Sequence, residues 1–294
     1  MVTTRTGLFP IGFRCNCDWQ NDLPAAITFA VEHGFAGLDV GTRHADKLET
    51  ITAAGLTIGT VDVKWPWGPL MSPDPLRRRD AAQARAAYIR SAVEKGARLF
   101  FMCAFPEDDT RPRRENFKYA VDGYGQLCQA IEPLGAKIVL EGYPGSRPWF
   151  PTLACTPADC RALLYEVNSP ALGLNFDPSH LVRVGIDPLR FIQEFAPHIY
   201  HVHAKDTLFI SEALYEHGNL QEATFDPPHD FGGHHWRYTI PGHGCVPWLE
   251  MLDQLYVCGY RGMISIELED EDFTGSEELE KRGFLASRDF LVNC

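Results

Sequence analysis

Four apolar segments of this 294-residue chain end in a polar side chain that can bind a metal ion or move a proton. Glu141 ends "VLE", Asp177 ends "LNFD", His203 stands in "HVHAKD" and Glu267 stands in "ISIEL". Three carboxylates and an imidazole cannot share a small volume without a cation, because neighbouring like charges disfavour ionisation. Oxygen-rich ligation with one nitrogen suits Mn2+, Mg2+ or Co2+ better than a closed tetrahedral zinc site. The alternative is four unrelated, solvated strand ends.

The segments that must position these side chains are strands that alternate with helices. Apolar runs predict strands at residues 11–15, 37–40, 57–63, 98–104, 137–142, 172–177, 199–205 and 262–268. Amphipathic patterns predict helices at residues 21–34, 74–96, 116–135, 156–167, 187–195, 246–259 and 276–292. Eight nearly continuous apolar strands with helices between them favour a parallel sheet closed into a single (β/α)8 TIM barrel domain over residues 1–294. No GxGxxG motif follows the first strand, which disfavours an open dinucleotide-binding fold.

Three connections are long, and all of them follow strands. They cover residues 64–75 after the third strand, 143–157 after the fifth and 207–247 after the seventh. Barrel enzymes place their chemistry at the C-terminal ends of the strands, where these loops begin. We therefore expect the long loops to act as lids or to choose the substrate.

The segments "VLEG", "NFDPSHL", "HVHAKD" and "ISIELED" together resemble the xylose isomerase-like barrel superfamily of sugar isomerases, epimerases and inosose dehydratases. The stretches "DPSHLVRVGIDP" and "HAKDT … WRYTIPGHGCVPW" are similar to its sugar phosphate isomerase/epimerase branch. The resemblance runs from about residue 11 to 290 and is strongest after residue 137. It implies one divalent metal ion per chain, with Mn2+ favoured and Mg2+, Co2+ or Zn2+ as alternatives, held by Glu141, Asp177, His203 and Glu267.

The resemblance also implies proton transfer next to the carbonyl of a keto sugar or sugar derivative. In such chemistry the metal stabilises an enediolate while a carboxylate moves the proton. Glu141 and Glu267 match the two catalytic glutamates that family epimerases place on opposite faces of the sugar. His180 matches a histidine that contacts substrate, and it is the third catalytic candidate. The predicted function is therefore a metal-dependent sugar isomerase or epimerase.

The same enediolate can also react by β-elimination, and this second reaction defines the alternative function. A lyase of this kind would cleave a 3-oxo-glycoside or dehydrate an inosose. His180 would then donate a proton to the leaving oxygen or hold a hydroxyl group. The opposing interpretation of His180 is a rim histidine packed by its loop.

The other polar residues of the seventh strand and its loop have different expected roles, which depend on their depth in the barrel and on the side to which they point. His201 has the parity of His203 but lies one layer deeper, which predicts a hydrogen-bonded core histidine. Lys205 lies nearer the rim and is expected to reach the substrate or to pair with Glu141 or Asp177. Asp206 points the other way and is expected to support the loop. Arg237 resembles the family's arginine in this loop and could bind a substrate oxygen or carboxylate.

Aromatic and histidine residues of the long loops are further candidates for substrate contact. Trp65, Trp67 and Trp149 follow the third and fifth strands, where their rings could pack against the C–H faces of a sugar or could pin the loops. A tryptophan-lined mouth favours a substrate larger than a free sugar. A second cluster is formed by His229, His234 and His235, which indicates either a solvated polar loop or a second zinc site.

Composition excludes several classes of partner. A formal net charge of −12 disfavours a nucleic-acid backbone or an anionic membrane surface. An abasic-site endonuclease would share the fold, but it needs ligands on the second to fourth strands, where we expect Asp39, Asp62 and the pair Met102–Cys103 to offer little. No run of 18 apolar residues is present, the stretch "MVTTRTGLFPIGF" does not have the pattern of a signal peptide, and nine cysteines are scattered along the chain, so we expect a reducing, cytoplasmic location. A homo-oligomer is expected, and family lyases add a small β-rich second subunit as a candidate partner.

Overall fold

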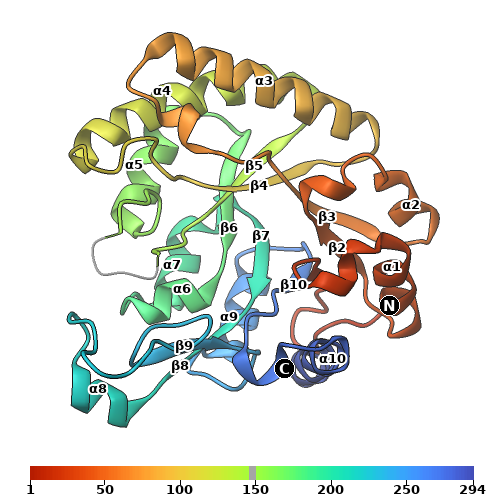
Figure 1. Ribbon diagram of the computed structural model, residues 1–294. Helices are drawn as coiled ribbons and strands as arrows, with labels where there is room; N and C mark the ends of the chain where they lie inside the picture. Colours follow the sequence, from red (N-terminus) through yellow and green to blue (C-terminus); the bar gives the residue numbers. More distant parts are fainter. Residues whose placement is uncertain (146–149) are drawn as a thin grey trace.

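The computed structural model describes residues 1–145 and 150–294, and its parallel strands close into one barrel (Figure 1). The order around the barrel is β1-β10-β7-β6-β5-β4-β3-β2. The strands are β1 (Ile11–Arg14), β2 (Gly37–Val40), β3 (Thr57–Asp62), β4 (Leu99–Cys103), β5 (Lys137–Glu141), β6 (Leu172–Phe176), β7 (Ile199–Ala204) and β10 (Ile264–Ile266). Each lies within two residues of a predicted strand, so the predicted TIM barrel is confirmed.

Ten α-helices are found in the described residues, and those between the strands surround the barrel (Figure 1). They are α1 (Leu23–Glu32), α2 (Leu48–Ala53), α3 (Pro75–Glu94), α4 (Arg113–Ile131), α5 (Pro157–Val167), α6 (Pro178–Arg183), α7 (Pro188–Phe195), α8 (Ser211–His217), α9 (Trp248–Val257) and α10 (Glu277–Asn293). Seven of them match predicted helices. The other three, α2, α6 and α8, have only six or seven residues, too few to repeat an amphipathic pattern.

Burial on both faces of the strands explains why their sequences are apolar. Every residue of β2 and β6 is buried, because barrel interior and helix layer cover opposite faces. The register then sets the site: Glu141 on β5 pairs with Asn175 on β6, and His203 on β7 pairs with Ser265 on β10. Polar side chains from these neighbouring strands therefore end at the same height, at the C-terminal rim of the barrel.

The long connection after β7 forms an antiparallel hairpin that the sequence did not predict. Strand β8 (Asp206–Phe209) pairs with β9 (Trp236–Thr239), and α8 lies between them in the chain. Asp206 accepts hydrogen bonds from the backbone of Gly242 and Val246 and from the indole of Trp248. The expected role of Asp206 as support for this loop is thus confirmed.

Two further features concern the helices and the cysteines. Among the described residues, none of the helices combines the length and the apolar character needed to cross a membrane. All nine cysteines are free thiols, and four of them are buried: Cys103, Cys128, Cys155 and Cys160.

Candidate active site

The four predicted metal ligands converge at the C-terminal rim of the barrel. Glu141 ends β5, Asp177 follows β6, His203 lies on β7 and Glu267 follows β10. Each offers one ligand atom, and these atoms all lie within 4.8 Å of one another. All four side chains are buried, with residue exposures of 0–6%. We call this group the rim cluster.

His203 shows which of its nitrogens belongs to the rim cluster. Its Nδ1 lies 2.7 Å from Oε1 of Glu141 and 3.4 Å from Oε2 of Glu267. The same oxygen of Glu141 accepts a hydrogen bond of 2.7 Å from Asn175. Burial would lower the pKa of His203, but the charges of Glu267 and Glu141 raise it well above its usual value. The imidazole therefore binds the carboxylates through the nitrogen that would face a metal ion.

Asp177 provides the clearest indication that the rim cluster fits a cation. Its Oδ1 accepts hydrogen bonds from the backbone and hydroxyl of Ser179, at 2.8 and 2.6 Å. Its Oδ2 is buried and has no hydrogen-bond partner among the described residues. This oxygen is contacted by Lys205 at 3.3 Å and by His180 at 3.4 Å but accepts no hydrogen bond from either, so it is free to bind a divalent cation. Three carboxylates and one imidazole are also the donor set that suits Mn2+ or Mg2+.

Lys205 lies within the carboxylates and is almost fully buried, with 1% exposure. Its Nζ lies 2.6 Å from Oε2 of Glu267, 2.9 Å from Oε2 of Glu269 and 3.3 Å from Oδ2 of Asp177. Pairing with Asp177 was expected, whereas the pairs with Glu267 and Glu269 were not. Burial would lower the pKa of Lys205, but Glu267 and Glu269 raise it well above its usual value. The ammonium group therefore offsets part of the negative charge of the site.

Glu269 is a carboxylate of the site that sequence reasoning missed. Its side chain is 29% exposed, so it lies closer to solvent than Glu267, two residues earlier. Burial raises the pKa of Glu269, and the charge of Glu267 adds to this, while Lys205 acts in the opposite direction. The signal was present in "ELED", because alternate residues of an extended segment point to the same side.

Arg14, at the end of β1, holds the other oxygen of Glu267. Its Nε lies 3.1 Å from Oε1 of Glu267, and its Nη1 lies 2.9 Å from Asp62 at the end of β3. Burial would raise the pKa of Glu267, but Lys205, His203 and Arg14 hold it well below its usual value. Glu267 is therefore ionised at neutral pH and is fixed through both of its oxygens.

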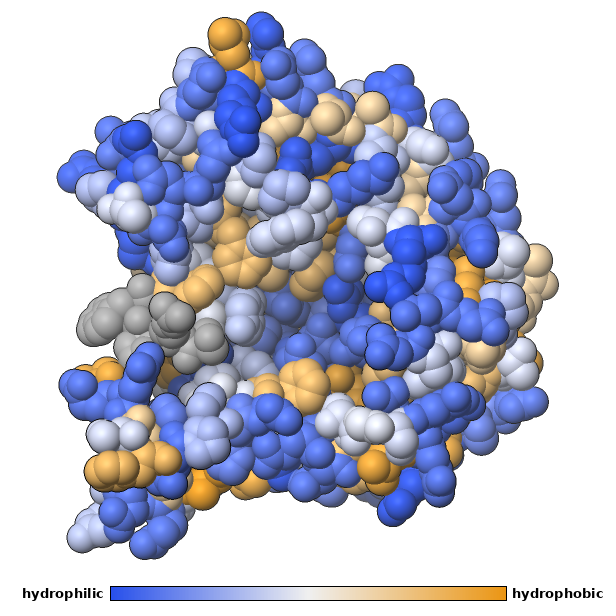
Figure 2. Space-filling view, viewed as in Figure 1, coloured by the Kyte–Doolittle hydropathy of each residue, from blue (hydrophilic) through white to orange (hydrophobic). Residues whose placement is uncertain are grey.

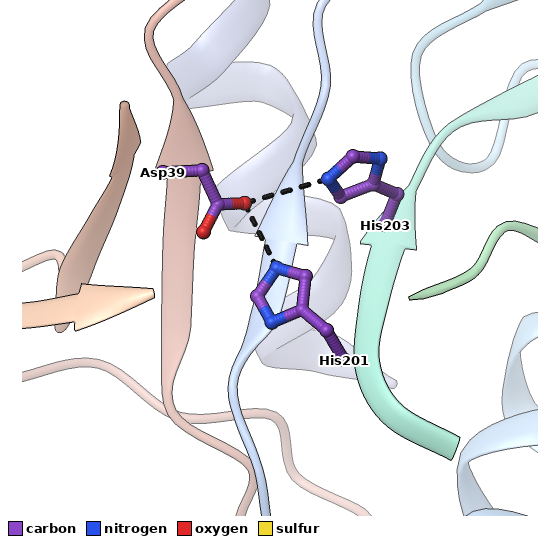
Figure 3. Close-up of side chains that lie close together, drawn as sticks. All are labelled: Asp39, His201 and His203. Atoms are coloured by element: carbon purple, nitrogen blue, oxygen red, sulfur yellow. Dashed lines mark hydrogen bonds and ion pairs between the residues drawn. The ribbon is translucent and has the colours of Figure 1, made fainter. Parts of the chain in front are cut away.

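A second group of metal-ligating side chains, Asp39, His201 and His203, lies below the rim cluster, and we call it the deep triad. Figure 3 shows both imidazoles directed at one oxygen of Asp39, with Nε2 of His201 at 2.8 Å and Nε2 of His203 at 3.5 Å. The other oxygen of Asp39 accepts a hydrogen bond of 2.6 Å from the backbone of Thr60. A Cβ on Gly59 would lie 2.0 Å from that oxygen, so glycine makes room for the carboxylate.

The deep triad corrects one expectation and confirms another. The second strand was expected to offer little to the site, but Asp39 at its end contacts the metal-ligand candidate His203. Burial would raise the pKa of Asp39, but His201 and His203 hold it well below its usual value. His201 is a hydrogen-bonded core histidine, as expected.

His180, on α6, lies between the rim cluster and the loop after β7. Its Nε2 lies 3.4 Å from Oε2 of Glu141 and 3.4 Å from Oδ2 of Asp177. Its Nδ1 lies 2.7 Å from the hydroxyl of Tyr238 on β9. The structure thus places this candidate at the metal ligands, with 2% exposure.

The tryptophans of the long loops have different surroundings. Trp67 donates a hydrogen bond of 2.7 Å to the carbonyl of Val63 and stacks on Phe105, so it pins its loop. It also contacts Phe101, which stacks on His203. Trp65 is 67% exposed and lines a groove against α3. Trp149 lies outside the described residues.

Arg237 and the loop histidines are engaged with other parts of the protein. Arg237 forms ion pairs with Asp270, Glu271 and Asp272, so the carboxylates that it holds belong to the chain itself. His229 lies 3.0 Å from Glu271. In the part of the chain that the structure describes, groups of three or more metal-ligating residues occur only in the rim cluster and the deep triad. His229, His234 and His235 do not form such a group.

The surface over the barrel is hollowed. Figure 2 shows a depression near the centre of this face, with hydrophilic residues in its depth and hydrophobic residues along part of its edge. A concave surface that combines apolar residues with convergent polar groups is a candidate small-molecule site.

Comparisons with known proteins agree with the barrel fold. Residues 28–294 match the xylose isomerase-like TIM barrel family. An inosose dehydratase of Clostridium beijerinckii is 24% identical over 283 residues, covering 91% of this chain and 90% of that protein. The D-psicose 3-epimerase of Clostridium cellulolyticum H10 has a TM-score of 0.72 at 16% identity, covering 97% of this chain and all of that one. The 3-keto-D-glucoside 4-epimerase of E. coli has a TM-score of 0.71, also at 16% identity, with the same coverage.

Proposed function

The chain belongs to the xylose isomerase-like TIM barrel family, and we propose that it is a divalent-metal-dependent sugar isomerase or epimerase. Inosose dehydratases and sugar epimerases among its relatives support an enzyme that acts on a sugar. The observation that carries the proposal is the rim cluster, in which Glu141, Asp177, His203 and Glu267 bring ligand atoms within 4.8 Å of one another.

The chemistry of the site follows from the charges of its carboxylates. The rim cluster would hold a divalent ion, which would supply Lewis-acid stabilisation of negative charge on a substrate carbonyl oxygen. Glu267 and Glu141 have pKa values below their usual range, because positive groups outweigh the effect of burial. Both are therefore ionised and able to accept a proton from the carbon next to that carbonyl. Arg14 and Lys205 hold Glu267 in place.

A lyase acting by β-elimination is the second candidate, and one observation favours it. The relatives that match nearly the whole chain in sequence include inosose dehydratases, whereas the epimerases are matched in fold at 16% identity. In this reaction His180 would donate a hydrogen bond to the oxygen that leaves, and the glutamate that takes the proton from carbon would pass it to that oxygen. Substrates of this class include inososes and 3-oxo-glycosides.

One experiment tests both candidates. The protein, loaded with Mn2+ or Mg2+, is incubated in D2O with ketohexoses, an inosose and 3-oxo-glucosides. We expect deuterium at the carbon next to the carbonyl, with an epimer or an elimination product identifying the reaction. Absence of deuterium from every substrate, or of any divalent ion near one per chain in the metal-loaded protein, would overturn the proposal.

Assembly and location stay predictions. We propose a homo-oligomer that acts in the cytoplasm, and a small β-rich second subunit as a candidate partner. Light scattering of the purified protein tests the homo-oligomer. Co-purification of a second chain from the native host tests the second subunit.

A further inference from the structure

A chain of two hydrogen bonds runs from Arg183 through Tyr238 to His180. Nη1 of Arg183 donates to the hydroxyl of Tyr238 at 2.9 Å, and this hydroxyl lies 2.7 Å from Nδ1 of His180. Tyr238 and His180 are both buried, at 3% and 2% exposure. Water is therefore not a ready substitute for either partner.

The direction of these two hydrogen bonds follows from the hydrogens that Arg183 and Tyr238 can donate. A guanidinium group has only donors, so the oxygen of Tyr238 must accept from Arg183. The single hydrogen of the Tyr238 hydroxyl then needs an acceptor, and Nδ1 of His180 is the acceptor within reach among the described residues. A hydrogen on Nδ1 would leave the buried hydroxyl hydrogen of Tyr238 without a partner, which is costly. Nδ1 is therefore bare, and the ring hydrogen of His180 lies on Nε2.

The other side of the His180 ring faces the rim cluster. Nε2 lies 3.4 Å from both Glu141 and Asp177, and it has no hydrogen-bond partner among the described residues. The rings of Tyr143 and Tyr238 flank the imidazole in edge-to-face contacts at 5.3 and 5.2 Å. The N–H of Nε2 is thus held in one orientation beside the metal ligands.

Arg183 connects this arrangement to two of the three long loops, those after β5 and β7. Its guanidinium donates to the carbonyl oxygen of Gly145 in the loop after β5. It also stacks over Trp236 on β9, with Cζ 3.8 Å from the ring centroid. The loops that surround the site therefore also fix the hydrogen-bond donor that orients Tyr238.

We infer that Arg183 and Tyr238 are positioning residues that keep His180 in the tautomer with its hydrogen on Nε2, so that His180 donates a hydrogen bond to a substrate oxygen. This rests on the proposed function for its substrate, a polyhydroxylated carbonyl compound. His180 then supplies a donor and does not remove the proton from the substrate carbon. That task falls to Glu141 or Glu267.

The tautomer can be measured without substrate. Nitrogen NMR of protein labelled with 15N-histidine, metal-free and with diamagnetic Mg2+, distinguishes a bare Nδ1 from a protonated one. The signals of His180 are assigned by their loss in His180→Gln. We expect a bare Nδ1 and a protonated Nε2 in the wild type. A protonated Nδ1, in either the neutral or the charged ring, would overturn the inference.

The variants test the role of each partner. Tyr238→Phe removes the hydroxyl, and we expect a mixture of His180 tautomers and a decrease in kcat/KM of about tenfold, the value of one lost hydrogen bond. Arg183→Met should shift the same signals, while Arg183→Lys, which retains a donor, should shift them less. The matched control is Tyr260→Phe, which removes a buried hydroxyl that donates to the carbonyl oxygen of Met263 and not to His180, Tyr238 or Arg183. It should leave the His180 signals unchanged.

The outcomes separate this inference from the proposed function. If His180 shows the expected tautomer in the wild type but no sugar exchanges deuterium, the proposed function fails and the positioning of His180 stands. If Tyr238→Phe and Arg183→Met both leave the tautomer unchanged, the positioning role is wrong even when the enzyme turns over. If either variant fails to fold, the wild-type tautomer and the remaining variant still decide.

Discussion

The rim cluster and the deep triad share His203, but they differ in how their carboxylates are neutralised. In the deep triad one carboxylate serves two imidazoles and the backbone N–H of Thr60, so Asp39 has partners on both oxygens. In the rim cluster three carboxylates share one imidazole, Lys205 and Arg14, and an oxygen of Asp177 is left without a hydrogen bond. Similar residue types therefore give a satisfied core in one place and an incomplete site in the other.

The shared histidine explains how the two groups depend on each other. Nδ1 of His203 faces Glu141 and Glu267, while Nε2 faces Asp39. Histidines that bind metals commonly have a carboxylate at the second nitrogen, which fixes the ring and raises its basicity. We therefore interpret the deep triad as support for the proposed metal ligand His203 and not as a second metal site.

The largest expected effect comes from the rim carboxylates. We expect Glu141→Gln and Glu267→Gln each to lower kcat by about 10²–10⁴-fold, because an amide cannot accept the substrate proton. Glu269→Gln is the matched comparison, since it removes a carboxylate that also contacts Lys205 but lies outside the four ligands, and we expect about tenfold or less. Steady-state kinetics measures the losses, and circular dichroism checks the fold. Full activity in both glutamine variants would contradict proton transfer by these residues.

A smaller effect is expected from Asp39, the carboxylate that lies below the rim cluster. Asp39→Asn should weaken metal binding by about 10–100-fold, the range seen when such a supporting carboxylate is removed. The reason is that His203 loses the charge that orients its ring. Titration calorimetry with Mn2+ measures the affinity. An unchanged affinity would mean that the rim cluster binds its ion without help from the deep triad.

The excess negative charge of the rim cluster also predicts a pH effect. Because Glu267 and Glu141 raise the pKa of His203 well above 6.5, the metal-free protein holds a proton on His203 at neutral pH. This protonated imidazole stabilises the metal-free fold fully below about pH 6.5, and the contribution is lost as the pH rises through the folded pKa. A metal ion at Nδ1 must displace the proton.

We therefore expect metal binding near pH 7 to release about one proton per chain. Calorimetry in buffers with different ionisation enthalpies gives this number directly. In the chelated protein, denaturant titrations should show the contribution of His203 declining only above pH 6.5. Metal binding that releases no proton would show that the rim carboxylates do not hold His203 in its charged form.

Much of the fold and part of the site could be predicted from the sequence. Strands buried on both faces leave apolar runs that are easily recognised, which is why all eight barrel strands were found. Glu141, Asp177, His203 and Glu267 were found because each interrupts such a run at the same end of its strand. The hairpin of β8 and β9 was missed because its strands are separated by more than 25 residues, and no tight turn marks their pairing.

Local sequence patterns could not predict the contacts across the barrel. Asp39 and His201 are 162 residues apart in the chain, and a single aspartate at a strand end is also typical of a solvated position. Arg14 was missed for the same reason, because its partners Asp62 and Glu267 come from other strands. Only closure of the barrel, in which β1 lies between β2 and β10, brings these residues together.

The smallest effect on metal binding is expected from His201, and it tests whether the rim cluster and the deep triad are separate groups. His201→Leu removes the hydrogen bond of 2.8 Å to Asp39, so we expect the free energy of unfolding to fall by about 1–3 kcal/mol. Asp39 keeps Thr60 and His203, so the Mn2+ affinity should change by no more than about threefold, well below the effect expected for Asp39→Asn. Denaturant unfolding and calorimetry measure the two quantities separately. If His201→Leu weakens metal binding as much as Asp39→Asn, the rim cluster and the deep triad form one metal site.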